Sequence, residues 1–180
     1  MADKNNFKII AFDDLSSTSM KAKELAAAGA DPWTIIVAKE QGGGYGRKGG
    51  VWFSPIGGLY FSVVLPKSNV EDLQILTILA AFCVAKAIKD LYEREPFVKL
   101  PNDVYLGGKK ICGILTENII SGEIKSSVIG IGVNTNIESF PGELERATSL
   151  KIELGHEVDN NRILVHTISQ LQQTFKAISH

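Results

Sequence analysis

A glycine-rich stretch at residues 39–55, KEQGGGYGRKGGVWFSP, holds the residue types best suited to binding an anion. Glycine adopts positive φ at little cost and lets the backbone approach a ligand closely. Arg47 and Lys48 lie inside the stretch, Trp52 follows them, and β-like segments precede and follow it. We therefore interpret it as an anion-binding loop rather than a flexible linker. Its six glycines are Gly42, Gly43, Gly44, Gly46, Gly49 and Gly50.

Three familiar phosphate-binding loops do not fit this stretch. The spacing Gly44-x-Gly46-x-x-Gly49 matches the dinucleotide fingerprint, but no helix start follows it. A protein kinase would need His-Arg-Asp and Asp-Phe-Gly further along, and neither string occurs. A P-loop would end in Gly-Lys-Ser or Gly-Lys-Thr, which is also absent. The stretch therefore keeps the residue types of an anion-binding loop but belongs to none of these three classes.

Three further polar clusters stand beside apolar runs. The first is the string KLPND at Lys99–Asp103. The second is Lys109 and Lys110, which lead into the apolar run ICGIL. The third is Asn134, which closes the run IGIGV. Because side chains alternate along a strand, Lys109 is expected to face solvent and Lys110 to face a site.

Simple structural roles also fit these polar residues. Asn102 and Asp103 are common turn residues. Ser17 and Thr18 precede an expected helix, so helix capping is the favoured interpretation and ligand binding the second. Charge and position alone do not decide between a solvated and a site-directed Lys110. These alternatives stay open on the residues alone.

The expected elements give an α+β protein with a mixed, largely antiparallel β-sheet and helices packed on one face. Ser68-x-x-Glu71 is a capping box that opens the longest helix. Gly107-Gly108 is a hairpin turn signal, and the region after Asn134 is expected to be loop. Helices are expected at 19–28, 68–92 and from 160 onward, and strands at 7–12, 33–38, 59–65, 97–100, 104–106, 109–117 and 124–133.

Composition places the chain among globular proteins with one domain over residues 1–180. It is 44% hydrophobic and 22% charged, and its net charge of −1 gives no reason to expect nucleic acid or an anionic membrane as a partner. The longest apolar run is too short to span a bilayer, and the polar start is no signal peptide. Cys83 and Cys112 are expected to be free buried thiols. No disulfide or metal site is expected, and the expected location of the protein is the cytoplasm.

An ordered set of strings across nearly the whole chain resembles the catalytic domain of a biotin protein ligase. A single one of these strings would be weak evidence, but their order is specific. They are Ser17-Thr18, Glu40-Gln41, GYGRKG (44–49), WFSP (52–55), GLYFS (58–62), KLPND (99–103), KICGILTE (110–117) and GIGVN (130–134).

The resemblance implies ATP-dependent activation of biotin to biotinyl-5′-AMP and transfer of biotin to a lysine of a biotin carboxyl carrier protein, as in acetyl-CoA carboxylase or a similar carboxylase. Mg²⁺ would be held mainly by the ATP phosphates, with no metal ligands from the protein. Lys110, Arg47 and Asp103 are implied as catalytic residues. The implied biotin contacts are Ser17, Thr18, Gln41, Gly44, Gly46, Arg47, Trp52, Lys110 and Gly113. The implied nucleotide contacts are Gly44, Tyr45, Gly46, Arg47, Trp52, Asn102, Lys110 and Asn134.

The chain departs from the family pattern at three positions. Tyr45 stands where the family loop has its first arginine, Gly50 replaces a further basic residue, and Ser19 replaces an asparagine. No N-terminal DNA-binding domain and no C-terminal SH3-like domain are expected, and a homodimer is implied because family members often dimerise. Without an apolar anchor before Val51, the glycine-rich loop (Gly42–Gly50) is expected to be mobile until ligand binds.

Two other functions remain open on the sequence. Lipoate or octanoate ligases and transferases share the fold and the acyl-transfer chemistry, although the loop and WFSP strings favour biotin. A non-catalytic biotin-binding relative would have lost its ATP chemistry with the missing cations.

Overall fold

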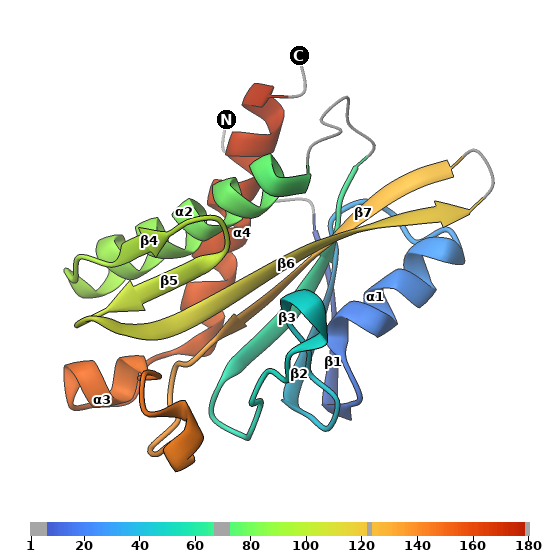
Figure 1. Cartoon of the computed structure of the whole chain (residues 1–180). Coiled ribbons are helices and arrows are strands. Elements are labelled where there is room, and N and C mark those ends of the chain that lie inside the picture. The colour runs from blue at the N-terminus through green and yellow to red at the C-terminus, as the bar shows by residue number, and fades with distance from the viewer. Residues whose placement is uncertain (1–6, 67–72, 122–123, 179–180) are drawn as a thin grey trace.

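The computed structural model, which describes residues 7–66, 73–121 and 124–178, centres on a seven-stranded mixed sheet (Figure 1). The strand order is β1-β2-β3-β7-β6-β5-β4. Among these strands β1 pairs in parallel with β2, and every other pairing is antiparallel. This confirms the predicted α+β class. The strands are β1 (Lys8–Leu15), β2 (Thr34–Gln41), β3 (Leu59–Val64), β4 (Phe97–Lys99), β5 (Asp103–Leu106), β6 (Lys109–Ser121) and β7 (Ile124–Val133).

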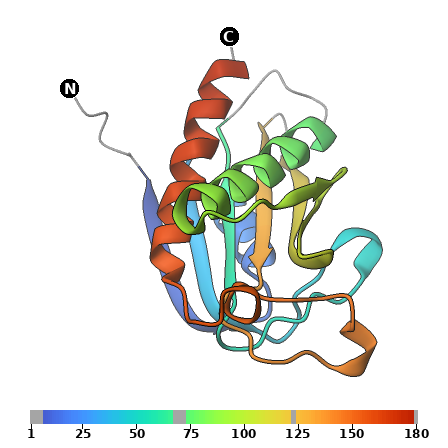
Figure 2. The ribbon, with the colours of Figure 1, turned by 90° about the vertical axis from the view of Figure 1, so that its left-hand side faces the viewer.

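The helices cover both faces of this sheet. The long helices α2 (Leu73–Tyr92) and α4 (Asn160–Ile178) lie side by side on one face, while α1 (Thr18–Ala27) lies on the other (Figure 2). The alternation of β2 explains both layers, because Ile35 joins the core under α2 and α4, and Ile36 joins the core under α1. The expectation that helices pack on one face holds for α2 and α4 and is wrong for α1.

The connection from β1 through α1 to β2 sets up the functional end of the sheet. The parallel strands β1 and β2 need a crossover connection, and α1 lies within it. Only Ser16 and Ser17 separate the end of β1 from the start of α1. Ser17 caps α1, its Oγ accepting from the backbone N–H of Met20 at 3.4 Å, and Gly29 follows the helix with φ of 88°. Leu15 pairs with Gln41, so the start of α1 and the end of β2 lie together.

The helices of the larger core carry the apolar stripes that the sequence predicted. Along α4, the predicted stripe is confirmed, because Leu164, Ile168, Leu171 and Phe175 are all buried. Helix α2 buries residues four apart, and the capping box predicted at Ser68-x-x-Glu71 lies outside the described residues. The buried α2 set is Leu76, Ala80, Ala81, Cys83, Val84, Ala85, Ala87 and Ile88.

The hairpin of β5 and β6 carries one lysine to each face. Gly107 and Gly108 have φ of 59° and 79°, which confirms the predicted two-residue turn. Lys109 is exposed after this turn, and Lys110 is half-buried and faces the α1 side of the sheet. The predicted directions of the two lysines are confirmed, but a bulge at Ile111 sets them, because Cys112 lies in the α2 core and strict alternation would turn Lys110 to that side.

The segment after Asn134 is more ordered than the predicted loop. A 3₁₀ turn η2 (Gly142–Leu144) and a short helix α3 (Leu150–Leu154) lie within it. Ser149 caps α3, its Oγ accepting from the N–H of Ile152 at 3.2 Å, and Gly155 ends the helix with φ of 80°. A five-residue helix is too short to show a helical period, so its end signals alone could have indicated it.

The two cysteines are free and buried, as predicted. Burial raises the pKa of the Cys112 thiol. Burial also raises the pKa of the Cys83 thiol, and a hydrogen bond with Thr174 offsets only part of that rise. The reactive thiolate is therefore scarce in the folded chain. We expect iodoacetamide at pH 8 to leave both thiols unmodified in native protein and to modify both in denaturant, as read by intact mass. Fast modification of the native chain would contradict this burial.

Among the described residues, no helix combines the length and the apolar character that crossing a membrane requires.

Candidate functional site

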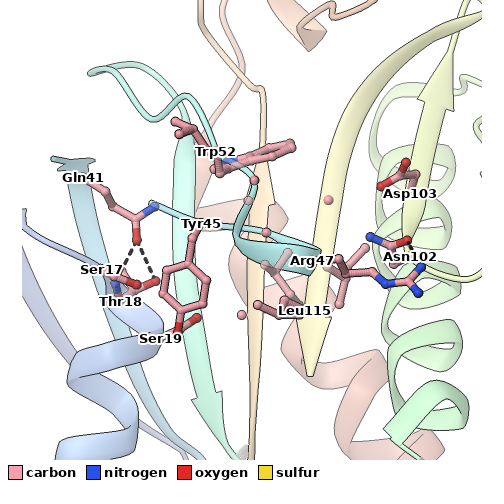
Figure 3. Close-up of a pocket in the computed structure, with 18 of the residues that line it drawn as sticks. Ser17, Thr18, Ser19, Gln41, Tyr45, Arg47, Trp52, Asn102, Asp103 and Leu115 are labelled. Carbon is pink, nitrogen blue, oxygen red and sulfur yellow. Dashed lines mark hydrogen bonds between the residues drawn. The ribbon is translucent and has the colours of Figure 1, made fainter. Parts of the chain in front are cut away.

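A cavity of about 390 Å³ lies on the α1 face of the sheet, between the start of α1, the glycine-rich loop and strands β6 and β7 (Figure 3). It collects side chains from segments that are far apart in the sequence. The cavity brings together most of the residues that the sequence singled out: Ser17, Thr18, Gln41, Tyr45, Gly46, Arg47, Trp52, Asn102, Asp103, Lys110 and Gly113.

Two of the predicted contact residues do not line this cavity. Gly44 is buried below the loop, where a Cβ would meet Ser54 Oγ at 2.6 Å and the carbonyl oxygen of Trp52 at 2.8 Å. Asn134 is also buried, and its Nδ2 donates to the carbonyl oxygen of Thr148 at 3.0 Å. In this structure Gly44 permits close packing, and Asn134 fastens the end of β7 to the segment before α3.

One end of the cavity is a fixed hydrogen-bond network centred on Gln41. Its Oε1 accepts from the backbone N–H of Thr18 at 2.8 Å and from Thr18 Oγ1 at 3.1 Å. Its Nε2 donates to Ser54 Oγ at 2.9 Å, which donates in turn to the carbonyl oxygen of Trp52 at 2.9 Å. The backbone donor of Thr18 determines which end of the amide is the oxygen. Gln41 is therefore held in one orientation, with one Nε2 hydrogen left over.

The same network gives Ser19 a defined role. Ser62, fully buried on β3, donates to Thr18 Oγ1 at 2.9 Å. A hydroxyl has a single hydrogen, so the 3.0 Å bond between Ser19 Oγ and Ser62 Oγ must take its hydrogen from Ser19. The Ser19 oxygen then keeps acceptor capacity at the cavity wall. Sequence analysis noted Ser19 only as a departure from the family pattern and missed its pairing with Ser62, because the two serines are 43 positions apart.

The floor of the cavity is made of glycine. Gly113 on β6 lies opposite Gly132 on β7, and Gly130 follows on the same face. A Cβ at Gly113 would meet the Trp52 ring at 2.9 Å, one at Gly132 would overlap the indole nitrogen, and one at Gly130 would overlap Ser19 Oγ. Two glycines spaced by two in a strand share a face, which was the signal for Gly130 and Gly132 that sequence reasoning left unused.

The other end of the cavity is cationic. Lys110 Nζ lies 2.7 Å from Asp103 Oδ1 and 5.3 Å from the centre of the Trp52 ring. Arg47 Nη1 donates to Asn102 Oδ1 at 3.2 Å (Figure 3), and Lys48 also lines the cavity. Three cations therefore face one acid, Asp103, among the lining residues, which suits an anionic ligand.

The glycine-rich loop is anchored in this structure. Its start is held to the β1–α1 junction, where Gly43 N donates to the carbonyl oxygen of Ser16 at 2.8 Å. Tyr45 and Val51 form an antiparallel bridge around the 3₁₀ turn η1 (Arg47–Gly49). The sequence considered only an apolar anchor before Val51, and the structure adds a polar one, because the Tyr45 hydroxyl makes two hydrogen bonds to residues outside the loop.

Among the described residues, no group of three or more His, Cys, Asp or Glu side chains lies close enough to hold a metal ion.

Comparison with known proteins gives a consistent set of relatives. A model of the "Biotin/lipoate A/B protein ligase family" matches residues 11–134. The "Bifunctional ligase/repressor BirA" of Bacillus subtilis is 36% identical over 174 residues, which are 93% of this chain and 54% of that protein. The "Biotin--[acetyl-CoA-carboxylase] ligase" of Paracoccus denitrificans is 33% identical over 156 residues, 82% of this chain and 65% of that protein.

Solved structures agree with these sequence relatives. The biotin protein ligase of Aquifex aeolicus in complex with biotin and ATP superposes with a TM-score of 0.86 at 31% identity, covering 96% of this chain and 72% of that one. The chain spans roughly half to two-thirds of the length of the two curated relatives described above.

Proposed function

Since the chain belongs to the biotin/lipoate A/B protein ligase family, we propose that it activates biotin with ATP to biotinyl-5′-AMP and then transfers biotin to a lysine of a carrier protein. The observation that carries this proposal is the cavity itself. It has a neutral, hydrogen-bonded end at Thr18 and Gln41, a cationic end at Lys110 and Arg47, and a glycine floor between them. A ligand with a polar neutral head and an anionic tail fits this arrangement.

The neutral end favours biotin over lipoate. The ureido ring of biotin carries two N–H donors and a carbonyl acceptor, and the cavity offers the Ser19 oxygen as an acceptor and the free Nε2 hydrogen of Gln41 as a donor. The dithiolane ring of lipoate has no N–H and only weak acceptors, so it would leave these polar groups without partners. An unmatched buried polar group costs about 1–3 kcal/mol.

The cationic end supplies the electrostatics of activation. When the biotin carboxylate attacks the α-phosphate, two anions approach each other and further negative charge develops on the phosphoryl oxygens. Lys110 and Arg47 carry fixed positive charges at the place where these groups would meet. A charge held there in advance stabilises the transition state without reorganisation.

The transfer step would use the acid beside Lys110. The carrier lysine nitrogen attacks the acyl carbon, the bond to the AMP oxygen breaks, and AMP leaves. Asp103 is the one carboxylate among the described lining residues, and its side chain is 20% exposed, so it can accept the proton of the incoming amine.

Magnesium fits this site only as part of the nucleotide complex. The single lining carboxylate, Asp103, is already paired with Lys110 at 2.7 Å, so the ATP phosphates would provide most of the ligands. When bound, Mg²⁺ would neutralise phosphate charge. Positioning of the carboxylate and the α-phosphate falls to Lys110, Arg47 and the loop backbone.

The proposed partners follow from the reaction. They are biotin, ATP and a biotin carboxyl carrier protein of acetyl-CoA carboxylase or a similar carboxylase. No nucleic acid or membrane partner is proposed, and we propose a cytoplasmic homodimer.

Isothermal titration and an assay of pyrophosphate release test the proposal. Biotin should bind, ATP with biotin should release pyrophosphate, and lipoate should bind at least about tenfold more weakly, because it leaves Ser19 and Gln41 unmatched. Binding of biotin without pyrophosphate release would identify a non-catalytic binding protein. Preference for lipoate or octanoate would identify an acyl ligase or transferase of the other branch of the family.

A further inference from the structure

Tyr45 of the glycine-rich loop joins two charged residues beyond the loop, Lys23 on α1 and Glu117 on β6. Its Oη donates to Glu117 Oε2 on β6 at 2.8 Å and accepts from Lys23 Nζ on α1 at 2.9 Å. Lys23 Nζ also donates to Glu117 Oε1 at 2.8 Å, which closes a three-membered ring of contacts. We name Lys23, Tyr45 and Glu117 the Tyr45 cluster.

The cluster is partly shielded from water. The side chains of Lys23 and Glu117 are 31% and 26% exposed. Burial lowers the pKa of Lys23, but its hydrogen bonds to Glu117 and Tyr45 outweigh this, and the net pKa lies above the ordinary value. Burial raises the pKa of Tyr45, and Glu117 adds to the rise while Lys23 opposes it. At neutral pH the cluster therefore holds a cation and a neutral phenol.

A tyrosine suits this position better than the arginine that stands there in related loops. The phenol can accept from Lys23 and donate to Glu117 at the same time, whereas arginine has no acceptor. An arginine here would compete with Lys23 for Glu117, and the two positive side chains would repel each other at close range. The Lys23–Glu117 pair and Tyr45 are thus matched to each other in this chain.

The Tyr45 cluster fixes the part of the loop that carries Arg47. The backbone bridge between Tyr45 and Val51 closes the loop upon itself, and Gly46 N donates to the carbonyl oxygen of Gly50 at 2.7 Å. Those contacts are internal and do not hold the tip to the sheet. The Tyr45 hydroxyl ties the base of this turn to α1 and β6, and Arg47 Nη1 at its tip donates to Asn102 Oδ1 at 3.2 Å, so the turn is held beside the cavity that both residues line.

We propose that Tyr45 is a positioning residue, whose hydroxyl pins the glycine-rich loop across the cavity through Lys23 and Glu117 and so slows the escape of the acyl-adenylate. The loop-pinning half stands on the contacts alone, and the half about the intermediate rests on the proposed function. Tyr45 acts through the loop rather than on the reacting atoms.

Limited proteolysis of the ligand-free chain tests the pinning. Trypsin can cut after the exposed residues Arg47 and Lys48, and mass spectrometry reports the rate at these bonds. Tyr45→Phe and Glu117→Gln should each raise this rate about tenfold, the scale of one hydrogen bond to a charged group. The double variant should be no faster than the faster single variant, because both remove the same connection.

A matched pair of lysine variants on α1 separates pinning from net charge. Lys23→Gln should accelerate loop cleavage as Tyr45→Phe does. Lys21→Gln makes the same charge change on the same helix, where Lys21 pairs with Glu24 at 2.7 Å, and should leave the rate unchanged. Equal effects of the two lysine variants, or wild-type cleavage in Tyr45→Phe, would overturn the proposal.

Retention of the intermediate tests the second half. Labelled biotin and ATP are first mixed with the protein to form labelled adenylate. An excess of unlabelled biotin and ATP is then added, and the loss of protein-bound label measures the rate at which the adenylate is released. Tyr45→Phe and Tyr45→Arg should both release it about tenfold faster, while the biotin Kd changes little. Release at the wild-type rate from either variant would refute the role of the phenol. If wild-type protein forms no adenylate, the proposed function fails, and proteolysis alone decides the pinning.

Discussion

Replacing Lys110 with alanine is expected to slow adenylate formation by about a hundredfold or more, the scale seen when one preorganised stabilising group is removed. Lys110 lines the cavity next to the bulge where the pairing of β5 and β6 shifts register, and its Nζ lies 2.7 Å from Asp103 Oδ1 and 5.3 Å from the centre of the Trp52 ring. Its ammonium would interact most strongly when the carboxylate and the phosphate share charge in the transition state, so the rate should fall more than biotin affinity. Single-turnover pyrophosphate release and calorimetry give the two quantities.

Lys109→Ala is the matched control for this prediction. Lys109 is exposed and does not line the cavity, and its loss should leave adenylation unchanged. Thermal unfolding of Lys110→Ala should show a moderately lower midpoint, because the buried Asp103 Oδ1 loses its partner, so the rates are compared well below that midpoint. If Lys109→Ala stopped adenylation and Lys110→Ala did not, the assignment of the catalytic lysine would be refuted.

Replacing Gly132 with alanine is expected to weaken biotin binding by about a hundredfold, or roughly 3 kcal/mol, the upper part of the usual cost of overpacking. A Cβ at Gly132 would overlap the Trp52 indole nitrogen, and the strand backbone beneath it is held by pairing with β3 and β6. The indole must therefore leave the floor, and the cavity loses the wall against which a ligand would pack. Calorimetry with biotin measures the loss.

Gly142→Ala is a suitable control, because nothing lies within 4 Å of the Cβ position and its φ is not positive. Tryptophan emission gives a second readout. Trp52 and Trp33 are the two tryptophans of the chain, so a Trp33→Phe background isolates Trp52. The emission of Gly132→Ala should shift to longer wavelength as the indole becomes wetter. An unchanged biotin affinity together with unchanged emission would show that the floor tolerates a methyl group.

Local pattern was enough to predict most of the fold. Strand alternation predicted β3, and Gly107-Gly108 predicted the hairpin turn, while the direction of Lys110 depends on a bulge in β6 that has no local signal. Helical spacing predicted α4. The position of α1 on the far face could not be predicted in this way, because it depends on how the β1–α1–β2 crossover turns over the sheet rather than on the short helix itself.

The site was predictable where its residues form continuous strings. Arg47, Trp52 and Lys110 stand in such strings and line one cavity. Pairings between distant residues gave no local signal, as between Ser19 and Ser62 or between Tyr45 and Glu117. Asn134 is the opposite case, since the sequence suggests a ligand contact at a strand end, while in this structure its Nδ2 donates to the backbone carbonyl of Thr148.

Backbone hydrogen bonds from residues 146–150 support β6 at Lys110 and the end of β7 at Asn134. Lys110 N donates to the carbonyl oxygen of Arg146 at 2.7 Å, Thr148 N donates to the carbonyl oxygen of Lys110 at 2.9 Å, and Leu150 N donates to that of Asn134 at 2.9 Å. A gene cut after residue 134 would encode every described cavity residue and none of these supports. Residues after 134 thus act on the cavity through backbone bonds to Lys110 and Asn134, since none of the described ones lines it.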